Sequence, residues 1–460
     1  MNFSYLRREP GFYRRVFTLA LPVVLQNLIT TSLGFMDTFM VGLVGQEQMS
    51  AVTVANVPIY IIQLIVFGLQ SGSRVLISQF WGRGDRESIN RVMGIGFFVA
   101  GGISTLCALT MGLFPRQVLM LITDNARLVE LGTSYIRIVG FSYILNSLSS
   151  IYIGMQQSIE NPRFGMTVFA ISTVCNTVGN YILIFGKLGL PALGITGAAI
   201  ATFSSRVVEF VISLVYALHC KQMPLLPACI LRPGKATFRS FVKFSTPVLL
   251  NETLWGTGTS LYTVIMGHMA GNTDLISAYT VAGNIDKMVT VAIFGVAAAA
   301  VIVGKEVGMG GKNAYPIGQA LTFVAFCTGF GVAIAEQLLF WLVLKPHVLP
   351  LFSMTAASAS LCVTMMICYS ISAPLHAFAT TGIVGVLRGG GDVRIAMLID
   401  VLPLWCFTLP LLVLLGLVLH APIAIFCFIM ATESALKVPF GLHRIRSGKW
   451  IHDVTQDLNA

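Results

Sequence analysis

The 460 residues of the chain are 55% hydrophobic and only 10% charged, and their formal net charge is +10. Because soluble domains carry about 25% charged residues, this composition excludes a soluble globular domain. The apolar runs are also too continuous for a membrane β-barrel, whose strands alternate apolar and polar residues over ~10 positions. We therefore predict an all-α integral membrane protein. In a membrane protein, positive charge indicates which loops are cytoplasmic, so we do not expect a nucleic-acid partner from it.

Twelve apolar runs follow one another along the chain, and each is long enough to cross a bilayer as a helix, which needs about 20 residues. We expect the spans, within a few residues, at 16–44, 51–77, 92–114, 132–155, 164–186, 193–218, 244–268, 276–303, 316–343, 358–387, 395–419 and 421–442.

The basic residues predict the orientation of these spans. Most of the 29 Lys and Arg residues fall at the two ends of the chain and in the even-numbered loops. The odd-numbered loops hold only Arg116, Arg127, Lys187 and Lys345. Since cytoplasmic loops are the basic ones, we expect a multi-pass protein of the cell membrane with both termini cytoplasmic.

The two halves of the chain repeat each other. The segment Ser50-Ala-Val-Thr-Val-Ala55 matches Ser277-Ala-Tyr-Thr-Val-Ala282, and Leu21-Pro-Val-Val-Leu25 resembles Thr246-Pro-Val-Leu-Leu250. Six spans per half is an even number, so both halves have the same orientation. We expect two six-helix lobes related by a parallel internal repeat, a fold that places substrate between the lobes.

A basic stretch with three prolines separates the sixth and seventh runs and predicts a linker between the lobes. The expected organisation is a cytoplasmic lead at 1–15, an N-lobe at 16–218, a cytoplasmic linker at 219–243, a C-lobe at 244–442 and a cytoplasmic tail at 443–460.

Asp37 is the strongest candidate for a functional residue. It is the only ionisable residue between Arg15 and Glu47, and it lies inside the first span. A carboxylate in the hydrocarbon costs roughly 2.5–3.5 kcal/mol on insertion scales, so a cavity, a neighbour or a bound cation must compensate for it. We expect Asp37 to face a cavity and to exchange a cation. The alternative is that it only hydrogen-bonds a neighbouring helix.

Three further polar residues of the first half are expected at the depth of Asp37. Asn176 and Asn180 are spaced i, i+4 in the fifth span and so share one helix face. Thr202 lies in the outer half of the sixth span. With Asp37 they would supply oxygen ligands for a Na⁺-like ion, or hydrogen-bonding neighbours for a proton-binding carboxylate. The alternative is ordinary polar packing between spans.

The second half carries its acidic residues at other positions. The repeat-equivalent of Asp37 is Tyr262, and no other metal site than Na⁺ at Asp37 is expected. The candidates for second-lobe coupling or substrate binding are Glu252, Asp286, Asp400 and His376.

For the remaining charged residues inside the spans we expect the following partners and surroundings. Instead of a role in coupling, Asp286 and its neighbour Lys287 could form ion pairs with other buried charges. Arg206 and Glu209, at i and i+3, are expected to neutralise each other. Glu433 has no obvious partner in the sequence, and Glu336 and Asp400 are expected near enough to the interfaces to be hydrated.

The chain lacks the signatures of an enzyme. It contains no Gly-x-Ser-x-Gly, no His-Glu-x-x-His and no phosphate-binding Gly-x-x-x-x-Gly-Lys-Ser/Thr motif. Its nine cysteines lie mostly inside apolar runs without a Cys-x-x-Cys pair, so neither disulfides nor a cofactor are expected. A membrane enzyme and transport driven by ATP at this chain are both disfavoured.

Several motifs together resemble the multidrug and toxic compound extrusion (MATE) family, in its prokaryotic NorM/DinF-like form. They include Met36-Asp37-Thr38 with Val41-Gly42, Gly82-Arg-Gly84, Asn180-Tyr-Ile-Leu-Ile-Phe-Gly186, Gly194-Ile-Thr-Gly-Ala-Ala-Ile-Ala-Thr202 and Leu387-Arg-Gly-Gly-Gly-Asp392. The resemblance implies a twelve-helix, two-lobed antiporter that expels cationic or amphipathic small molecules in exchange for Na⁺ or H⁺. It carries the first-lobe cation site of the family over to Asp37, Asn176, Asn180 and Thr202.

In one branch of that family a second-lobe acidic pair lies on spans 7 and 10. Glu252 matches the first member, but the matching stretch of span 10 has His376 and no carboxylate. This departure favours coupling through the first lobe. The remaining alternatives are an exporter of an endogenous metabolite and a flippase for a lipid-linked precursor. The expected partners are small molecules and membrane lipids, and we expect a monomer.

Overall fold

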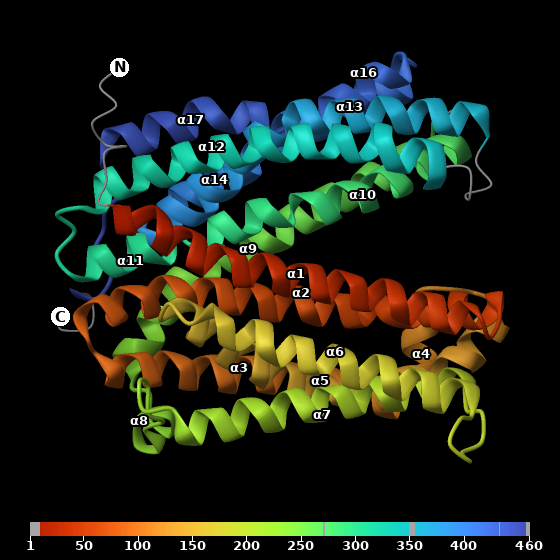
Figure 1. The fold of residues 1–460 in the computed structure, drawn as a ribbon, viewed down its shortest axis with the longest axis horizontal. Helices are drawn as coiled ribbons and strands as arrows, with labels where there is room; N and C mark the ends of the chain where they lie inside the picture. Colours follow the sequence, from red (N-terminus) through yellow and green to blue (C-terminus); the bar gives the residue numbers. More distant parts are fainter. Residues whose placement is uncertain (1–9, 270–271, 349–354, 432, 457–460) are drawn as a thin grey trace. The chain divides into compact units, whose positions relative to one another are not determined.

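The computed structural model describes residues 10–269, 272–348, 355–431 and 433–456, and in these ranges every long element is a helix (Figure 1). The predicted lead at 1–9 and the end of the tail at 457–460 lie outside the described residues. The described chain divides into two compact units. The N-terminal unit comprises 25–249, and the C-terminal unit comprises 10–24 together with 250–456.

In the N-terminal unit, long helices pack side by side, with α5 against α2, α3 and α7, and α6 against α7 (Figure 1). Two short helices lie in its loops. Its complete helices are α2 (Gln46–Arg83), α3 (Arg86–Leu113), α4 (Pro115–Met120), α5 (Ala126–Ser158), α6 (Pro162–Phe185), α7 (Gly194–His219) and α8 (Pro227–Leu231).

The C-terminal unit is also helical, and its long spans contain π-helical segments. One such segment, Leu404–Thr408, directly follows Pro403, which has no backbone N–H to donate to the helix. The helices are α10 (Asn272–Ala298), α11 (Val301–Gly308), α12 (Ala314–Leu339), α13 (Ala356–Phe378), α14 (Val393–Pro403), α15 (Leu409–Val413), α16 (Ile423–Ala431) and α17 (Glu433–Ser447). The other π-helical segments are Phe340–Val348, Ala379–Leu387 and Leu414–Val418.

Two helices are each divided between the two units. The helix α1 (Pro10–Gly42) passes from the C-terminal to the N-terminal unit after Val24, and α9 (Lys235–Gly267) passes the other way after Leu249. Pro22 and Pro247 lie just before these two boundaries. Proline removes one backbone hydrogen bond of a helix. Both repeats therefore lose a helical hydrogen bond at the corresponding position, next to the unit boundary.

Over most of their described residues, the predicted spans coincide with helices. In the part of the chain that the structure describes, eleven helices or helix runs are long and apolar enough to cross a membrane. The seventh predicted span, 244–268, lies in α9, which is long but less apolar because it carries residues such as Asn251 and Glu252. The expected linker at 219–243 is partly helical, since α8 lies within it and α9 begins at Lys235. The lobe boundaries themselves stay a prediction.

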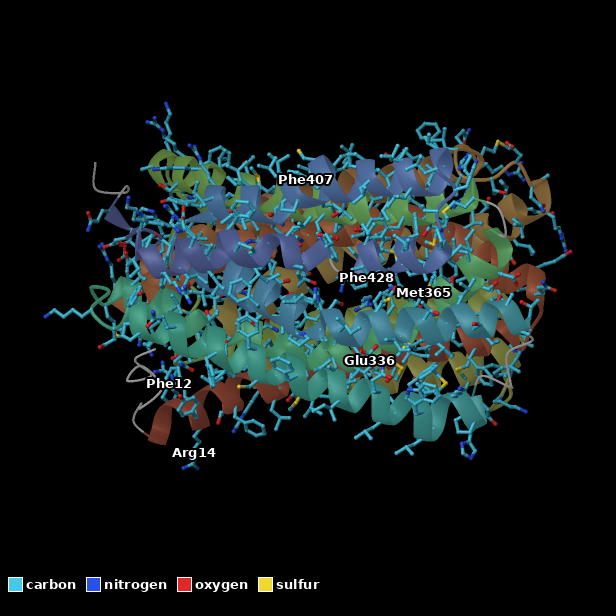
Figure 2. All side chains as sticks on the ribbon, turned by 90° about the horizontal axis from the view of Figure 1, so that it is seen from above. Phe12, Arg14, Glu336, Met365, Phe407 and Phe428 are labelled. Carbon is cyan, nitrogen blue, oxygen red and sulfur yellow. The ribbon has the colours of Figure 1, made fainter. Side chains whose placement is uncertain are left out.

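Large apolar side chains face outward along the helices. Phe407 is 63% exposed and Phe428 is 49% exposed on the C-terminal unit (Figure 2). An apolar surface this extensive would cause aggregation in water, and it suits a helix bundle whose surroundings are lipid. The fold is that of a multi-pass membrane protein.

Gly186 ends the helix that carries the candidate asparagines. Its backbone is left-handed, with φ of 65°, and its N–H bonds to the carbonyl of Ile182. A Cβ atom at this position would lie 2.5 Å from the backbone nitrogen of Ala192, so a side chain cannot fit without moving the loop. Glycine is therefore required here for two reasons, conformation and space.

We expect Gly186→Ala to lower the thermal stability of the detergent-solubilised protein more than Gly189→Ala does. Gly189 is also left-handed, with φ of 80°, but a Cβ there has nothing within 4 Å. The matched variant therefore isolates the backbone strain, which costs about 1–2 kcal/mol. Equal losses of stability in the two variants would show that the contact with Ala192 is unimportant.

Candidate functional site

The carboxylate of Asp37 lies in the part of α1 that belongs to the N-terminal unit, where it begins a chain of polar contacts. Its Oδ1 accepts a hydrogen bond of 2.6 Å from Nδ2 of Asn180. That nitrogen also donates to Oδ1 of Asn176 at 3.0 Å, and Nδ2 of Asn176 lies 3.4 Å from Oγ1 of Thr202. The structure thus brings together all four residues that the sequence proposed for the first half.

The packing of two helices explains why Thr202 reaches the asparagines. Asn176 and Asn180 are one turn apart on α6, so both side chains lie on the same face. The facing helix α7 approaches closely at Gly197, where a Cβ atom would lie 2.6 Å from the carbonyl oxygen of Leu183. This close approach places Thr202 beside Asn176. Both asparagines are almost completely buried.

The charges near this site leave Asp37 without an ion pair among the described residues. Arg206 bonds instead to Glu209, with 2.7 Å between Nη1 and Oε2, as the sequence predicted. Glu209 also accepts a hydrogen bond of 3.1 Å from Asn146, which sequence reasoning had missed. The guanidinium is therefore held by a carboxylate other than Asp37.

Asn180 provides one more feature of a binding site. Its Oδ1 is buried, and within the described ranges no group donates to it. Buried acceptors usually have a partner, so an unpaired one requires an explanation. Together with the carboxylate of Asp37 and the hydroxyl of Thr202, it forms a set of oxygens. Such a set suits a hard monovalent cation, and the carboxylate alone could hold a proton.

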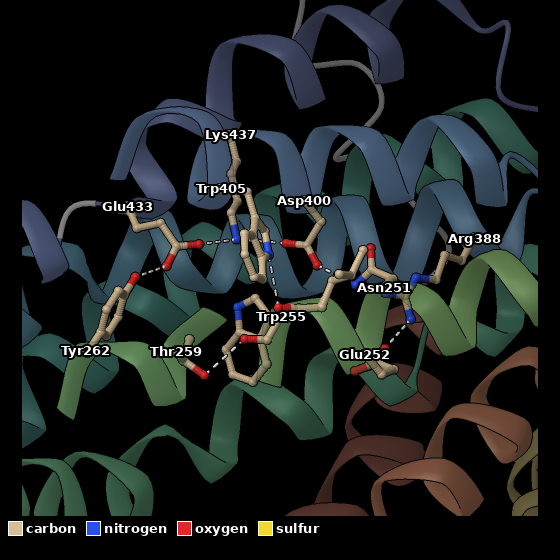
Figure 3. Close-up of polar contacts among 11 residues, drawn as sticks. Asn251, Glu252, Trp255, Thr259, Tyr262, Arg388, Asp400, Trp405, Glu433 and Lys437 are labelled. Carbon is tan, nitrogen blue, oxygen red and sulfur yellow. Dashed lines mark hydrogen bonds and ion pairs between the residues drawn. The ribbon is translucent and has the colours of Figure 1, made fainter. Parts of the chain in front are cut away.

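In the C-terminal unit two of the three acidic candidates, Glu252 and Asp400, form ion pairs with basic residues (Figure 3). Oε1 of Glu252 lies 2.6 Å from Nη1 of Arg388. Oδ1 of Asp400 lies 2.8 Å from Nζ of Lys437, and its Oδ2 accepts a hydrogen bond of 2.7 Å from Asn251. Neither carboxylate therefore resembles Asp37, which forms no ion pair with any described residue.

Lys437 also forms an ion pair with a second carboxylate, that of Glu433. Its Nζ lies 2.6 Å from Oε1 of Glu433, and Tyr262 donates a hydrogen bond of 2.7 Å to Oε2 of the same residue (Figure 3). The expectation that Glu433 lacks a partner was wrong. The i, i+4 spacing of Glu433 and Lys437 was the signal that could have found the pair. Tyr262, the repeat-equivalent of Asp37, thus contacts a carboxylate instead of supplying one.

The expectation of hydrated carboxylates near the interfaces was also wrong. Asp400 is only 6% exposed and Glu336 is 0% exposed. Helix packing inside the bundle covers both, and distance along a helix does not reveal such burial. Asp286 is half-buried on α10, and no ion pair joins it within the described ranges. His376, on α13, lies with its ring 6.3 Å from that of Phe294.

Comparisons with known proteins agree with this fold. A family model described as MatE matches residues 22–182. The chain is 26% identical to the multidrug resistance protein MdtK of Edwardsiella ictaluri over 415 residues, which is 88% of each protein. It is 24% identical to the probable multidrug resistance protein NorM of Thermotoga maritima over 315 residues, 67% of each. The chain is thus similar to MATE proteins over most of its length.

A solved structure shows a similar fold over nearly the whole chain. The MATE transporter VcmN of Vibrio cholerae, in a substituted form, superposes on this chain with a TM-score of 0.83 at 19% sequence identity. The match covers 95% of this chain and 98% of the other. The predicted two-lobed, twelve-helix fold is thus confirmed.

Proposed function

We propose that this chain is a MATE transporter, a secondary active exporter of cationic or amphipathic small molecules in antiport with Na⁺ or H⁺. The observation that carries the proposal is the site of Asp37. There a membrane-embedded carboxylate lies beside a buried amide oxygen, and among the described residues the first has no ion pair and the second no donor. The relatives named above are described as multidrug resistance proteins, which supports the class of substrate.

The hydrogen bond from Asn180 suggests how a cation would be exchanged. In the present state the amide nitrogen of Asn180 partly compensates the charge of Asp37. A bound Na⁺ would repel that N–H, so the amide would turn and offer its oxygen instead. A proton on Asp37 would make the carboxyl a donor, and the turned amide would accept from it. Either ion changes the contact between α1 and α6.

The coupling of ion and substrate follows from thermodynamics. Whatever the ion does to the affinity for the exported compound, that compound does to the affinity for the ion. One charge moving inward releases ~2.3 kcal/mol per 100 mV of membrane potential, which is enough for roughly a fifty-fold gradient of substrate. A single coupling carboxylate is therefore sufficient to drive export.

A flippase for an anionic lipid-linked precursor is less favoured. Such a substrate would require several buried basic groups that are available for its phosphates. Arg206, Arg388 and Lys437 are instead each bonded to a carboxylate within its own unit. An exporter of an endogenous cationic metabolite would use the same site, and only the choice of substrate would differ.

Ethidium efflux from inverted membrane vesicles, with Na⁺ and pH gradients imposed separately, tests the proposed function. We expect transport of this cationic dye to follow one of the two gradients, which identifies the coupling ion. If no cationic dye moves under either gradient while the protein is present and folded in the vesicles, the proposal of cation export is wrong.

A further inference from the structure

Positive charge is concentrated in the stretch that leads from α7 into α9. No Asp or Glu occurs between Glu209 and Glu252, whereas five Lys and Arg residues do. They are Lys221, Arg232, Lys235, Arg239 and Lys243. The structure shows no ion pair for Arg232, Lys235 or Arg239 within the described ranges. The charges of these three side chains are therefore available to a partner outside the chain.

The stretch before α9 is folded onto the N-terminal unit, so it is an ordered surface. The side chain of Asn90, on α3, donates a hydrogen bond of 3.2 Å to the carbonyl oxygen of Pro224 and accepts one of 3.1 Å from the N–H of Leu226. The helix α8 then packs against α3 (Figure 1), and a Cβ atom at Gly94 would lie 2.4 Å from the carbonyl oxygen of Ile230. A surface that is held in this way loses little conformational entropy when it binds a partner.

The beginning of α9 is fixed in the same unit by its other face. Ser240, Phe241 and Phe244 are all buried. On α2, a Cβ atom at Gly72 would lie only 2.6 Å from Cα of Ser245, so the backbones of the two helices approach closely. The opposite face of α9 is therefore turned outward in a fixed orientation.

This outward face combines basic and apolar side chains. Lys235, Arg239 and Lys243 are spaced i, i+4 and i+8, so they share one face of the helix, and all three are exposed. Between them lie Phe238 and Val242, which are 49% and 43% exposed. Side chains of both kinds are satisfied together at the surface of a bilayer, where apolar groups contact acyl chains and basic groups contact headgroups.

The length of α9 places this face at the level of the lipid headgroups. Its 33 residues are about 50 Å long, whereas the hydrocarbon core is ~30 Å thick. The predicted span begins at 244, so Lys243 and Arg239 precede it by one and five residues, or at most about 8 Å along the helix. The headgroup layer is about 5–8 Å thick on each side. The phosphates of the lipids are therefore within reach of these side chains.

We propose that the face of α9 formed by Lys235, Phe238, Arg239, Val242 and Lys243 binds the headgroups of anionic phospholipids. Clusters of basic residues next to a membrane span attract anionic lipids, and the two apolar side chains contact the acyl chains of the same lipids. A free phosphate ion would leave Phe238 and Val242 exposed to water. This surface is separate from the site of Asp37, and it does not depend on the proposed export of cationic compounds.

Native mass spectrometry of the full-length protein in detergent, titrated with phosphatidylglycerol or phosphatidylcholine, tests this proposal. We expect at least one phosphatidylglycerol to bind more tightly than phosphatidylcholine. Lys235→Gln combined with Arg239→Gln should weaken the binding of that lipid about 25-fold, or about fivefold for each charge removed. The matched control is Lys312→Gln with Lys449→Gln, which removes two exposed charges of the C-terminal unit and should leave the binding unchanged.

The proposal is overturned if phosphatidylglycerol binds no better than phosphatidylcholine, or if the two double variants lose the same affinity, because net charge alone would then explain the effect. Phe238→Ser keeps every basic residue and should still weaken the binding of phosphatidylglycerol, since the contact with the acyl chains is lost. If this variant binds the lipid like the wild type, or if millimolar inorganic phosphate displaces the lipid, the face is not a lipid-binding surface.

Discussion

Asp37→Asn is expected to reduce gradient-driven dye efflux by more than about tenfold, which corresponds to ~1.4 kcal/mol or more in the coupled step. The amide has the shape of the carboxylate, and its oxygen can still accept the hydrogen bond from Asn180. It has no charge, however, so it can neither bind a proton in the relevant range nor compensate a Na⁺ ion. The variant should therefore fold normally and lose the coupling.

The measurement is ethidium efflux from vesicles that contain equal amounts of wild-type and variant protein. Asp124→Asn is the matched control, since Asp124 is exposed in a loop and its loss of charge should leave transport unchanged. If efflux survives Asp37→Asn but fails in Glu252→Gln, coupling belongs to the C-terminal unit and the assignment to Asp37 is wrong.

The shared face and the depth of the residues around Asp37 could be predicted from sequence because they are local features of each helix, whereas the contact between Asp37 and Asn180, 143 residues apart, also depends on helix rotation. The i, i+4 spacing of Asn176 and Asn180 places them on one face, and the rise of a helix gives their depth relative to Asp37. These two rules need no knowledge of how the helices are rotated. The positions of the spans follow equally directly from runs of apolar residues.

The network of the C-terminal unit could not be predicted in this way. Glu252 and Arg388 are 136 residues apart, and Tyr262 and Glu433 are 171 residues apart. Whether two such residues meet depends on the rotation of each helix about its own axis. A helix that is apolar on all sides gives little sign of which side faces its neighbours. The pair formed by Glu433 and Lys437 is the exception, because it lies on one helix.

Lys437→Met is expected to lower the stability of the protein by about 3–5 kcal/mol, the usual cost of removing one partner of a buried charge pair. Methionine is close to lysine in size but has no charge. The substitution would leave Asp400 and Glu433, which now both bond to Nζ of Lys437, buried without a counter-charge. Because the three residues lie on α14 and α17, the repulsion would separate these helices.

The loss should appear as a lower midpoint of thermal aggregation in detergent. Lys449→Met is the matched control, since the side chain of Lys449 is exposed and its charge contributes little. Adding Asp400→Asn and Glu433→Gln to Lys437→Met should restore part of the stability, because the uncompensated charges are then removed. If Lys437→Met is as stable as the control, the two carboxylates are neutral without the lysine. If the triple variant recovers stability, the role of the Lys437 ammonium group is to neutralise the two carboxylates. Lys437 would then be a covalently attached cation for Asp400 and Glu433, whereas Asp37 must take its cation from solution.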